Sequence, residues 1–283
     1  MSPRSAIGVF DSGVGGLTVL KELVALVPAA DYLYFGDTAR LPYGSKSVET
    51  VARYAISAAR FLEEKKIELL VVACNTASAL ALPAIAAAVR VPVIGVIEPG
   101  ADAAAAASRT RKAVVIGTEG TVSSHAYQRA LAARGIEARE QACPLFVPLV
   151  EEGWTDHPVT EQVAHIYLDA LFQNGPAGAD VMVLGCTHYP LLKPLLRRLA
   201  PPSVTIVDSA ESTAQAVAAR LGSTLTSSVE TALKPSSADA LTGVSTGLHF
   251  FSTDSVEKFR RLGERFLGHP VEDVAHVDLD RLP

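Results

Sequence analysis

Short apolar runs alternate with longer amphipathic segments along most of the chain. Within Ser47–Lys66, for example, Val51, Ala55, Ala59 and Leu62 recur at the spacing of one helical face. Most apolar runs between such segments are rich in Val, Leu and Ile and carry few polar residues, as strands buried on both faces do. This alternation predicts the α/β class, with doubly wound parallel sheets covered by helices on both faces.

The pattern also predicts where the elements lie. The predicted strands, of which Glu137–Gln141 is the weakest, are Ala6–Phe10, Tyr32–Phe35, Leu69–Ala73, Val93–Val96, Ala113–Ile116, Glu137–Gln141, Val181–Gly185, Thr205–Asp208 and Leu248–Ser252. The predicted helices are Leu17–Val27, Ser47–Lys66, Ala77–Val89, Ser123–Arg134, Val159–Phe172, Ser209–Leu221 and Ser255–Leu267. The segment Ser223–Gly247 is rich in Ser, Thr, Ala and Gly, which predicts a flexible, exposed loop.

A weak internal repeat divides the chain into two similar halves. In the first half, strands end at Asp11 and at Cys74, and in the second half strands end at Thr118 and at Cys186. Each half would therefore present one cysteine at the carboxyl end of a strand, the edge at which open α/β sheets bind ligands. We expect two pseudo-symmetric α/β domains with the active site in the cleft between them.

The predicted domain boundaries follow from the point at which the pattern restarts. Residues 1–97 together with 208–283 form the first, discontinuous domain, and residues 98–207 form the second.

Composition and charge exclude several partners. The formal net charge is −5 and no long run of Lys and Arg occurs, so no nucleic-acid partner is expected. The most apolar long window, Val91–Ala107, is interrupted by proline, glycine and acidic residues, so no membrane span is expected. The N-terminal residues lack the pattern of an export signal, which predicts a cytoplasmic protein with reduced cysteines.

The usual signatures of cofactor and metal sites are missing. The turn Gly13–Gly16 suggests a dinucleotide site, with Asp37 as the ribose-binding acid, but Thr18 replaces the third glycine of that fingerprint. The three cysteines contain no C-x-x-C pair, and the histidines show no metal-binding spacing. No lysine follows a strand as a pyridoxal Schiff base would require. We expect neither a cofactor nor a metal.

Two cysteines are the candidate reactive groups. Cys74 and Cys186 each follow a buried strand and precede a helix, whose N-terminus favours a thiolate. A single free cysteine is more often a small buried apolar residue, but two at matching strand ends indicate chemistry. Cys143, between Ala142 and Pro144, has no such context and is assigned to packing.

Four further polar residues could assist the thiols. Asp11 could orient or accept a proton from a thiol or a substrate ammonium, and His188 could polarise Cys186. Glu151 and Glu152 follow an apolar stretch, and the sequence leaves two interpretations open for them: a solvated helix start or a carboxylate that assists Cys186.

Five motifs, in this order, resemble glutamate racemases, members of the cofactor-independent aspartate/glutamate racemase family. The motifs are Asp11–Leu20, Gly36–Arg40 with Pro42–Gly44, Val72–Ser78, Gly95–Gly100 and Leu184–Pro190. The resemblance runs from Ile7 to about Asp208, no motif residue departs from the family pattern, and beyond Ser209 it is loose.

The resemblance implies an isomerase that interconverts L- and D-glutamate without a cofactor and supplies D-glutamate for peptidoglycan. Cys74 and Cys186 would be the two bases, Asp11 would assist Cys74, and His188 with Glu151 would assist Cys186. The implied substrate-binding residues are Asp11, Ser12, Tyr43, Gly44, Asn75, Thr76, Thr187 and His188. We also expect a homodimer.

Three other functions stay open at this point. The first is a racemase for aspartate or another amino acid. The second is a cysteine hydrolase, although Cys186 and His188, two residues apart across a strand end, are poorly placed for a nucleophile–base pair. The third is an amino-acid-binding protein without catalytic activity.

Overall fold

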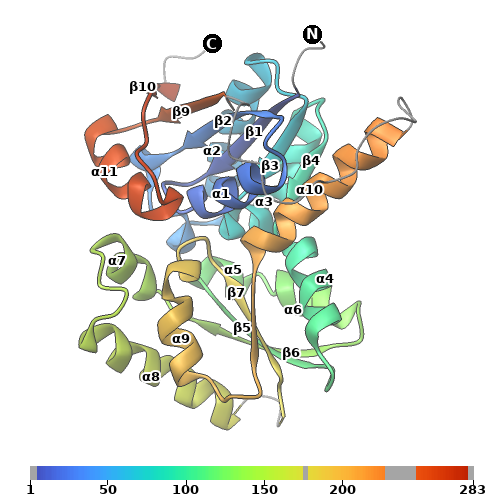
Figure 1. The fold of residues 1–283 in the computed structure, drawn as a ribbon, viewed down its shortest axis with the longest axis vertical. Helices are drawn as coiled ribbons and strands as arrows, with labels where there is room; N and C mark the ends of the chain where they lie inside the picture. The colour runs from blue at the N-terminus through green and yellow to red at the C-terminus, as the bar shows by residue number, and fades with distance from the viewer. Residues whose placement is uncertain (1–4, 175–177, 227–246, 280–283) are drawn as a thin grey trace, which may run out of the picture.

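The structure, a computed structural model, describes residues 5–174, 178–226 and 247–279. Its strands form two sheets in which all pairings are parallel (Figure 1). The first sheet has the order β10-β9-β2-β1-β3-β4, from β1 (Ala6–Asp11), β2 (Asp31–Gly36), β3 (Leu69–Val72), β4 (Val93–Gly95), β9 (Leu248–Ser252) and β10 (Val274–His276). The second has the order β6-β5-β7-β8, from β5 (Lys112–Gly117), β6 (Glu137–Ala142), β7 (Val181–Gly185) and β8 (Thr205–Asp208).

The two sheets share one topology. The order β2-β1-β3-β4 in the first sheet repeats as β6-β5-β7-β8 in the second, so that β3 and β7 occupy equivalent places. Cys74 follows β3 and Cys186 follows β7. The prediction of two parallel-sheet α/β domains is therefore confirmed, and the weak repeat in the sequence corresponds to a repeat in strand order.

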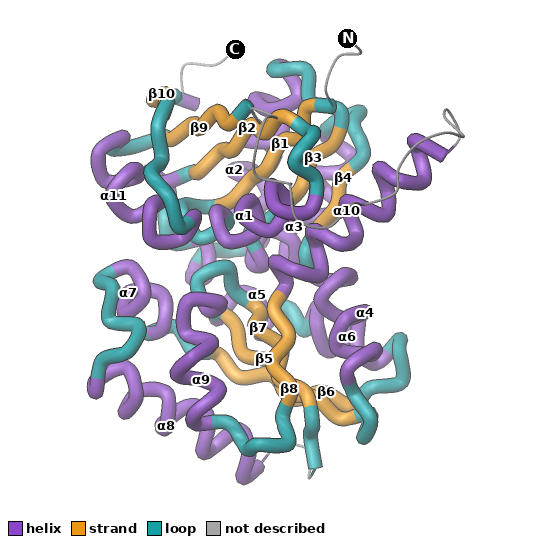
Figure 2. Tube along the Cα trace, in the orientation of Figure 1, coloured by secondary structure: helices purple, strands orange, loops and turns teal. Residues whose placement is uncertain are grey.

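Helices surround both sheets (Figure 2). They are α1 (Leu17–Leu26), α2 (Val48–Glu64), α3 (Asn75–Ala88), α4 (Ile97–Ala107), α5 (Glu119–Ser123), α6 (Ala126–Ala132), α7 (Phe146–Glu151), α8 (Pro158–Asn174), α9 (Lys193–Leu199), α10 (Ser209–Thr226) and α11 (Val256–Leu267). Three short 3-10 helices, η1 (Thr38–Arg40), η2 (Tyr43–Ser45) and η3 (Tyr189–Leu192), lie between them. In the described residues no helix has the length and apolar character that a membrane span requires.

Apolar packing joins the two halves. The largest buried cluster contains Val9 and Leu20 from the first half together with Met182 and Phe146 from the second. A second cluster lies around α2 and α3, and a third around β5 and α6. Cys186 lies in the first of these clusters and Cys74 in the second, so both strand ends that carry the cysteines are held by buried packing.

The sequence prediction failed at several helices. Helix α4 was not predicted; it contains Pro99 and Gly100, but proline is tolerated in the first turn of a helix. The helix predicted over Ser123–Arg134 is the shorter α6, which the left-handed His125, with φ 53°, separates from α5 ending at Ser123. Helix α7 and strand β10 were also not predicted.

The loop predicted over Ser223–Gly247 is wrong at its start. Helix α10 continues to Thr226, beyond the predicted end at Leu221, so 223–226 are helical. The remainder of that prediction, 227–246, lies outside the described residues.

Candidate active site

Cys74 is held at the junction of β3 and α3. It is the N-cap of α3, and its Sγ accepts a hydrogen bond from the Ala77 N–H at 3.4 Å. The same sulfur donates to the Ser12 hydroxyl at 3.5 Å. Burial and the nearby negative charge of Asp11 raise the pKa of Cys74 to about 12, against the opposing effect of these hydrogen bonds. Burial and the Asp11 charge thus outweigh the helix N-terminus, which was expected from the sequence to favour a thiolate at Cys74.

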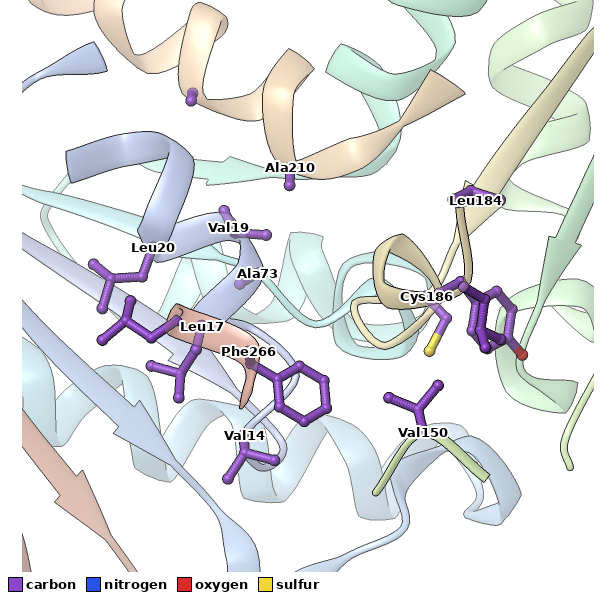
Figure 3. Packing of buried hydrophobic residues seen from close by; sticks show 14 of the residues in the cluster. Val14, Leu17, Val19, Leu20, Ala73, Val150, Leu184, Cys186, Ala210 and Phe266 are labelled. Atoms are coloured by element: carbon purple, nitrogen blue, oxygen red, sulfur yellow. The ribbon is translucent and has the colours of Figure 1, made fainter. Parts of the chain in front are cut away.

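Cys186 occupies the equivalent place after β7. All five residues of that strand are buried, and Cys186 itself is only 5% exposed. Its Sγ lies 4.0 Å from His188 Nδ1, since both residues belong to the short turn between the end of β7 and the start of η3. Their spacing in the sequence is poor for a nucleophile–base pair; the structure nevertheless brings their side chains to this distance. Cys186 belongs to the same buried cluster as Val14, Val150 and Phe266 (Figure 3).

His188 connects Cys186 to Glu151. The His188 Nε2 lies 3.2 Å from Glu151 Oε1, at the last residue of α7. Burial alone would lower the pKa of His188, but its contacts with Cys186 and Glu151 outweigh burial and raise it to about 10. The hydrogen bond with His188 in turn lowers the pKa of Glu151. Glu152 is exposed, so Glu151 is the carboxylate that contacts His188, at the end of a helix rather than at a solvated start.

Asp11 links the two halves at the end of β1. Its carboxylate accepts hydrogen bonds from the Gly13 N–H at 2.9 Å and from the Thr187 hydroxyl at 3.5 Å. Burial raises the pKa of Asp11, while the His188 charge and these hydrogen bonds oppose the rise. A side chain at Gly15 would collide with Thr187, and a Cβ at Gly16 would lie 2.5 Å from the Asp11 Cβ. Gly15 therefore allows close packing between the halves, and Gly16 allows close packing against Asp11 within the first half.

Asn75 bridges both halves through its amide. Its Oδ1 accepts a hydrogen bond from the Tyr127 hydroxyl at 2.8 Å, and its Nδ2 donates to the Ser209 hydroxyl at 3.3 Å. Tyr127 lies on α6 and Ser209 begins α10, so these partners come from distant parts of the chain. Sequence reasoning did not find them, because no local pattern marks either residue.

A group of threonine hydroxyls joins α3 to α5. Thr76 Oγ1 lies 2.8 Å from Thr118 Oγ1 and 3.4 Å from Thr121 Oγ1. Gly44 packs against the same group, since a Cβ there would lie 2.9 Å from the Thr118 Cβ. In the sequence, Thr118 is notable only as a strand end in the internal repeat. The signal that could have marked it as a site residue is its place in that repeat, which is equivalent to the position after β1.

Tyr43 directs its hydroxyl to another carboxylate. Its O–H donates to Asp37 Oδ2 at 2.5 Å, and the Thr253 hydroxyl donates to Asp37 Oδ1 at 2.9 Å. Asp37 is fully buried. The residue considered as a ribose-binding acid thus anchors the η2 segment.

The geometry is that of two thiols at equivalent strand ends, one beside a carboxylate and the other beside an imidazolium–carboxylate pair. Residues 7–217 match the model of the Asp/Glu/Hydantoin racemase family. The chain belongs to this family. It is 60% identical to the glutamate racemase of Koribacter versatilis, with 98% of each chain covered. It is 47% identical to the glutamate racemase of Thermus thermophilus, with 99% of each covered.

Solved structures of the same kind share the fold. The crystal structure of glutamate racemase from Thermus thermophilus in complex with β-chloro-D-alanine has a TM-score of 0.84 at 45% identity, covering 100% of both chains. The structure from Francisella tularensis in complex with D-glutamate has a TM-score of 0.86 at 33% identity, covering 99% of both.

Cys143 lies apart from the polar contacts of this racemase-family site. Its thiol is fully buried and donates to the Gln141 carbonyl at 3.6 Å. Burial and the proximity of Cys186 raise its pKa. In the described part of the chain no cluster of three or more His, Cys, Asp and Glu side chains could hold a metal ion.

Proposed function

We propose that this racemase interconverts L- and D-glutamate without a cofactor, by proton transfer between Cys74 and Cys186. The placement of the two thiols at equivalent strand ends supports the proposal most directly. The names of the curated relatives support the substrate, because glutamate racemases are 60% and 50% identical to the chain over 98% of its length. D-glutamate in the complex from Francisella tularensis supports it further.

In this proposal each face of the substrate α-carbon meets one thiol. Cys186 removes the proton from L-glutamate and the Cys74 thiol returns a proton to the other face; the roles reverse for D-glutamate. The pKa of about 12 keeps Cys74 protonated at rest, which suits the donor role in the L-to-D direction. The imidazolium of His188 faces Cys186, where it balances the charge of the abstracting thiolate.

The α-proton of glutamate is far less acidic than a thiol, so the site must stabilise the carbanion. We assign this role to neutral donors and to exclusion of water by closely packed halves. The substrate-binding residues in the proposal are Asp11, Ser12, Tyr43, Gly44, Asn75, Thr76, Thr187 and His188. Asp11 assists Cys74, and Glu151 acts through His188.

The proposal extends to the organisation of the protein. We propose residues 1–97 with 208–283 and residues 98–207 as the two domains, and a cytoplasmic homodimer as the working form. The product D-glutamate would supply peptidoglycan synthesis. Light scattering on the purified protein measures the oligomeric state, and a monomer at assay concentration would contradict the dimer.

The decisive experiment follows racemisation of L-glutamate in deuterium oxide, with purified protein and no added cofactor. Circular dichroism reports D-product, and NMR at low conversion reports the isotope at the α-carbon. With two thiols, first-formed D-glutamate carries solvent deuterium while unreacted L-glutamate keeps its hydrogen. Retention of substrate hydrogen in the product would contradict the two-base mechanism.

The same preparation distinguishes the other functions. Faster racemisation of aspartate or another amino acid than of glutamate would change the substrate. A covalent acyl-enzyme by mass spectrometry would indicate a cysteine hydrolase, which leaves Cys74 without a role. Tight glutamate binding without exchange of the α-hydrogen would indicate a binding protein.

A further inference from the structure

Two helices from opposite halves meet beside the His188–Glu151 pair. Helix α11 follows β9 of the first sheet and packs on α1, whereas α7 packs on η3 and α8 of the second half. Arg265 on α11 donates from Nη1 to the backbone carbonyl of Glu151 at 2.8 Å. That carbonyl belongs to the last residue of α7, where helix carbonyls lack intrahelical partners and a cation is favoured.

Gly153 leaves the space that the Arg265 guanidinium occupies. Its φ of +80° lies in the left-handed region that favours glycine. A Cβ at this position would lie 2.9 Å from Arg265 Nη1 and 3.1 Å from its Cζ. Glycine therefore meets two requirements here, the backbone conformation after α7 and the close approach of the arginine.

The residue next to Arg265 contacts the histidine. The Phe266 ring lies 5.0 Å from the His188 ring, centroid to centroid, at an interplanar angle of 77°. Phe266 is 2% exposed, so its position is fixed by packing. Two consecutive residues of α11 thus touch the two members of the pair: Arg265 the backbone of Glu151, and Phe266 the ring of His188.

We propose that Arg265 and Phe266 are positioning residues that hold the Glu151–His188 pair against Cys186 from the opposite half of the molecule. Within the described residues, neither side chain forms a hydrogen bond or ion pair with a thiol, so both act through the pair. Arg265 fixes the end of α7 from which the Glu151 carboxylate projects, and Phe266 restricts rotation of the imidazole. The effect on turnover rests on the proposed function; the effect on the pair does not.

Turnover tests the proposal through Arg265→Ala and Gly153→Ala. Loosening the pair should lower kcat about tenfold while the KM for glutamate changes less than about twofold, because the reacting geometry and not the ground-state contacts is disturbed. Arg265→Lys should restore most of the rate, since one N–H donor is enough for a carbonyl. Arg261→Ala removes the same charge from the same helix and should leave kcat within about twofold.

NMR of the substrate-free protein tests the same proposal without racemisation. The ¹⁵N-labelled His188 ring, assigned by comparison with His188→Gln, should deprotonate near pH 10 in the wild type. In Arg265→Ala it should deprotonate at lower pH, because Glu151 no longer holds the imidazolium. Cys186 and Asp11, the other charged groups that act on His188, are unchanged by this substitution. Loss of the Arg265 charge by itself would raise the His188 pKa, so a lower value reports the loosened contact with Glu151.

The two readouts separate the possible failures. A shifted His188 titration in a protein that does not racemise glutamate would leave the positioning role standing and remove the proposed function. An unchanged titration in Arg265→Ala, or a loss of rate that Arg265→Lys does not restore, would overturn the positioning role.

Discussion

The hydroxyl of Thr187 lies 3.5 Å from the carboxylate of Asp11, although the two positions are 176 residues apart in sequence. The contact joins the end of β1 in one sheet to the turn after β7 in the other. Thr18 strengthens the junction by donating to the Thr187 carbonyl at 3.0 Å. Asp11 therefore interacts electrostatically with residues of both halves: its charge raises the pKa of Cys74 and interacts with the charge of His188.

The charge on Asp11 should control the reactivity of Cys74. With a pKa raised to about 12, the Cys74 thiol is mainly protonated at pH 8. Asp11→Asn removes a negative charge that disfavours the thiolate, so the alkylation rate of Cys74 by iodoacetamide at pH 8 should rise at least about threefold. Peptide mass spectrometry measures the rate at each cysteine separately.

Two controls accompany this measurement. Asp169→Asn removes an exposed carboxylate on α8 and should leave the rate at Cys74 unchanged. The fully buried Cys143 should stay unreactive in Asp11→Asn, which shows that the protein has not opened. A slower or equal rate at Cys74 in Asp11→Asn would mean that the carboxylate does not set its protonation.

Cys143 should be dispensable for turnover. Its thiol already donates to the Gln141 carbonyl at 3.6 Å, and a serine hydroxyl can keep this bond. Cys143→Ser should therefore retain kcat within about twofold and lose about 1–2 kcal/mol of unfolding free energy through burial of a hydroxyl. Urea unfolding and a circular dichroism assay measure the two quantities. A folded Cys143→Ser protein without turnover would place the reactive groups elsewhere.

A methyl group at Gly44 should disturb the threonine cluster. The added Cβ would lie 2.9 Å from the Thr118 Cβ, so η2 and α5 must separate and the contact of Thr118 with Thr76 must change. Gly44→Ala should raise the KM for glutamate about tenfold, since these groups are proposed to bind substrate. Gly222→Ala, where a Cβ meets open space, is the matched control. Unchanged KM in Gly44→Ala would remove this region from the binding site.

The strands that position the thiols could be predicted because each is an uninterrupted run of apolar residues. Val181–Gly185 is apolar throughout, and all five residues are buried, so the strand and its end at Cys186 follow from the sequence. The same reasoning missed α4, which contains Pro99 and Gly100, although a helix tolerates proline in its first turn.

Contacts between distant residues were beyond the reach of the sequence. The choice between Glu151 and Glu152 depends on how α7 ends against His188, which no local pattern determines. Likewise, the Asn75 amide is held by Tyr127 and Ser209, 52 and 134 residues away. These are tertiary contacts, and residue spacing carries no information about them.

Protonation of His188 should make stability depend on pH. Its pKa is about 10 in the folded protein and about 6.5 in an unfolded chain. Because the folded value is the higher one, the stabilisation from protonated His188 is fully present below about pH 6.5 and is lost as pH rises toward 10. The wild type should therefore exceed His188→Gln in unfolding free energy most at pH 6, and this difference should shrink steadily up to pH 10.

Urea unfolding of both proteins at pH 6, 7, 8, 9 and 10 measures that difference. Groups that titrate alike in the two proteins contribute equally to both unfolding free energies and drop out of the difference. Glu151→Gln supplies the matched variant, because its carboxylate is one cause of the raised pKa. In Glu151→Gln the His188-dependent difference should vanish at lower pH than in the wild-type background, whereas in Glu152→Gln it should keep the wild-type profile, since Glu152 is exposed. A difference that stays constant or grows from pH 6 to 10 would show that the histidine is neutral in the folded protein, and its role beside Cys186 would then have to be that of a neutral donor.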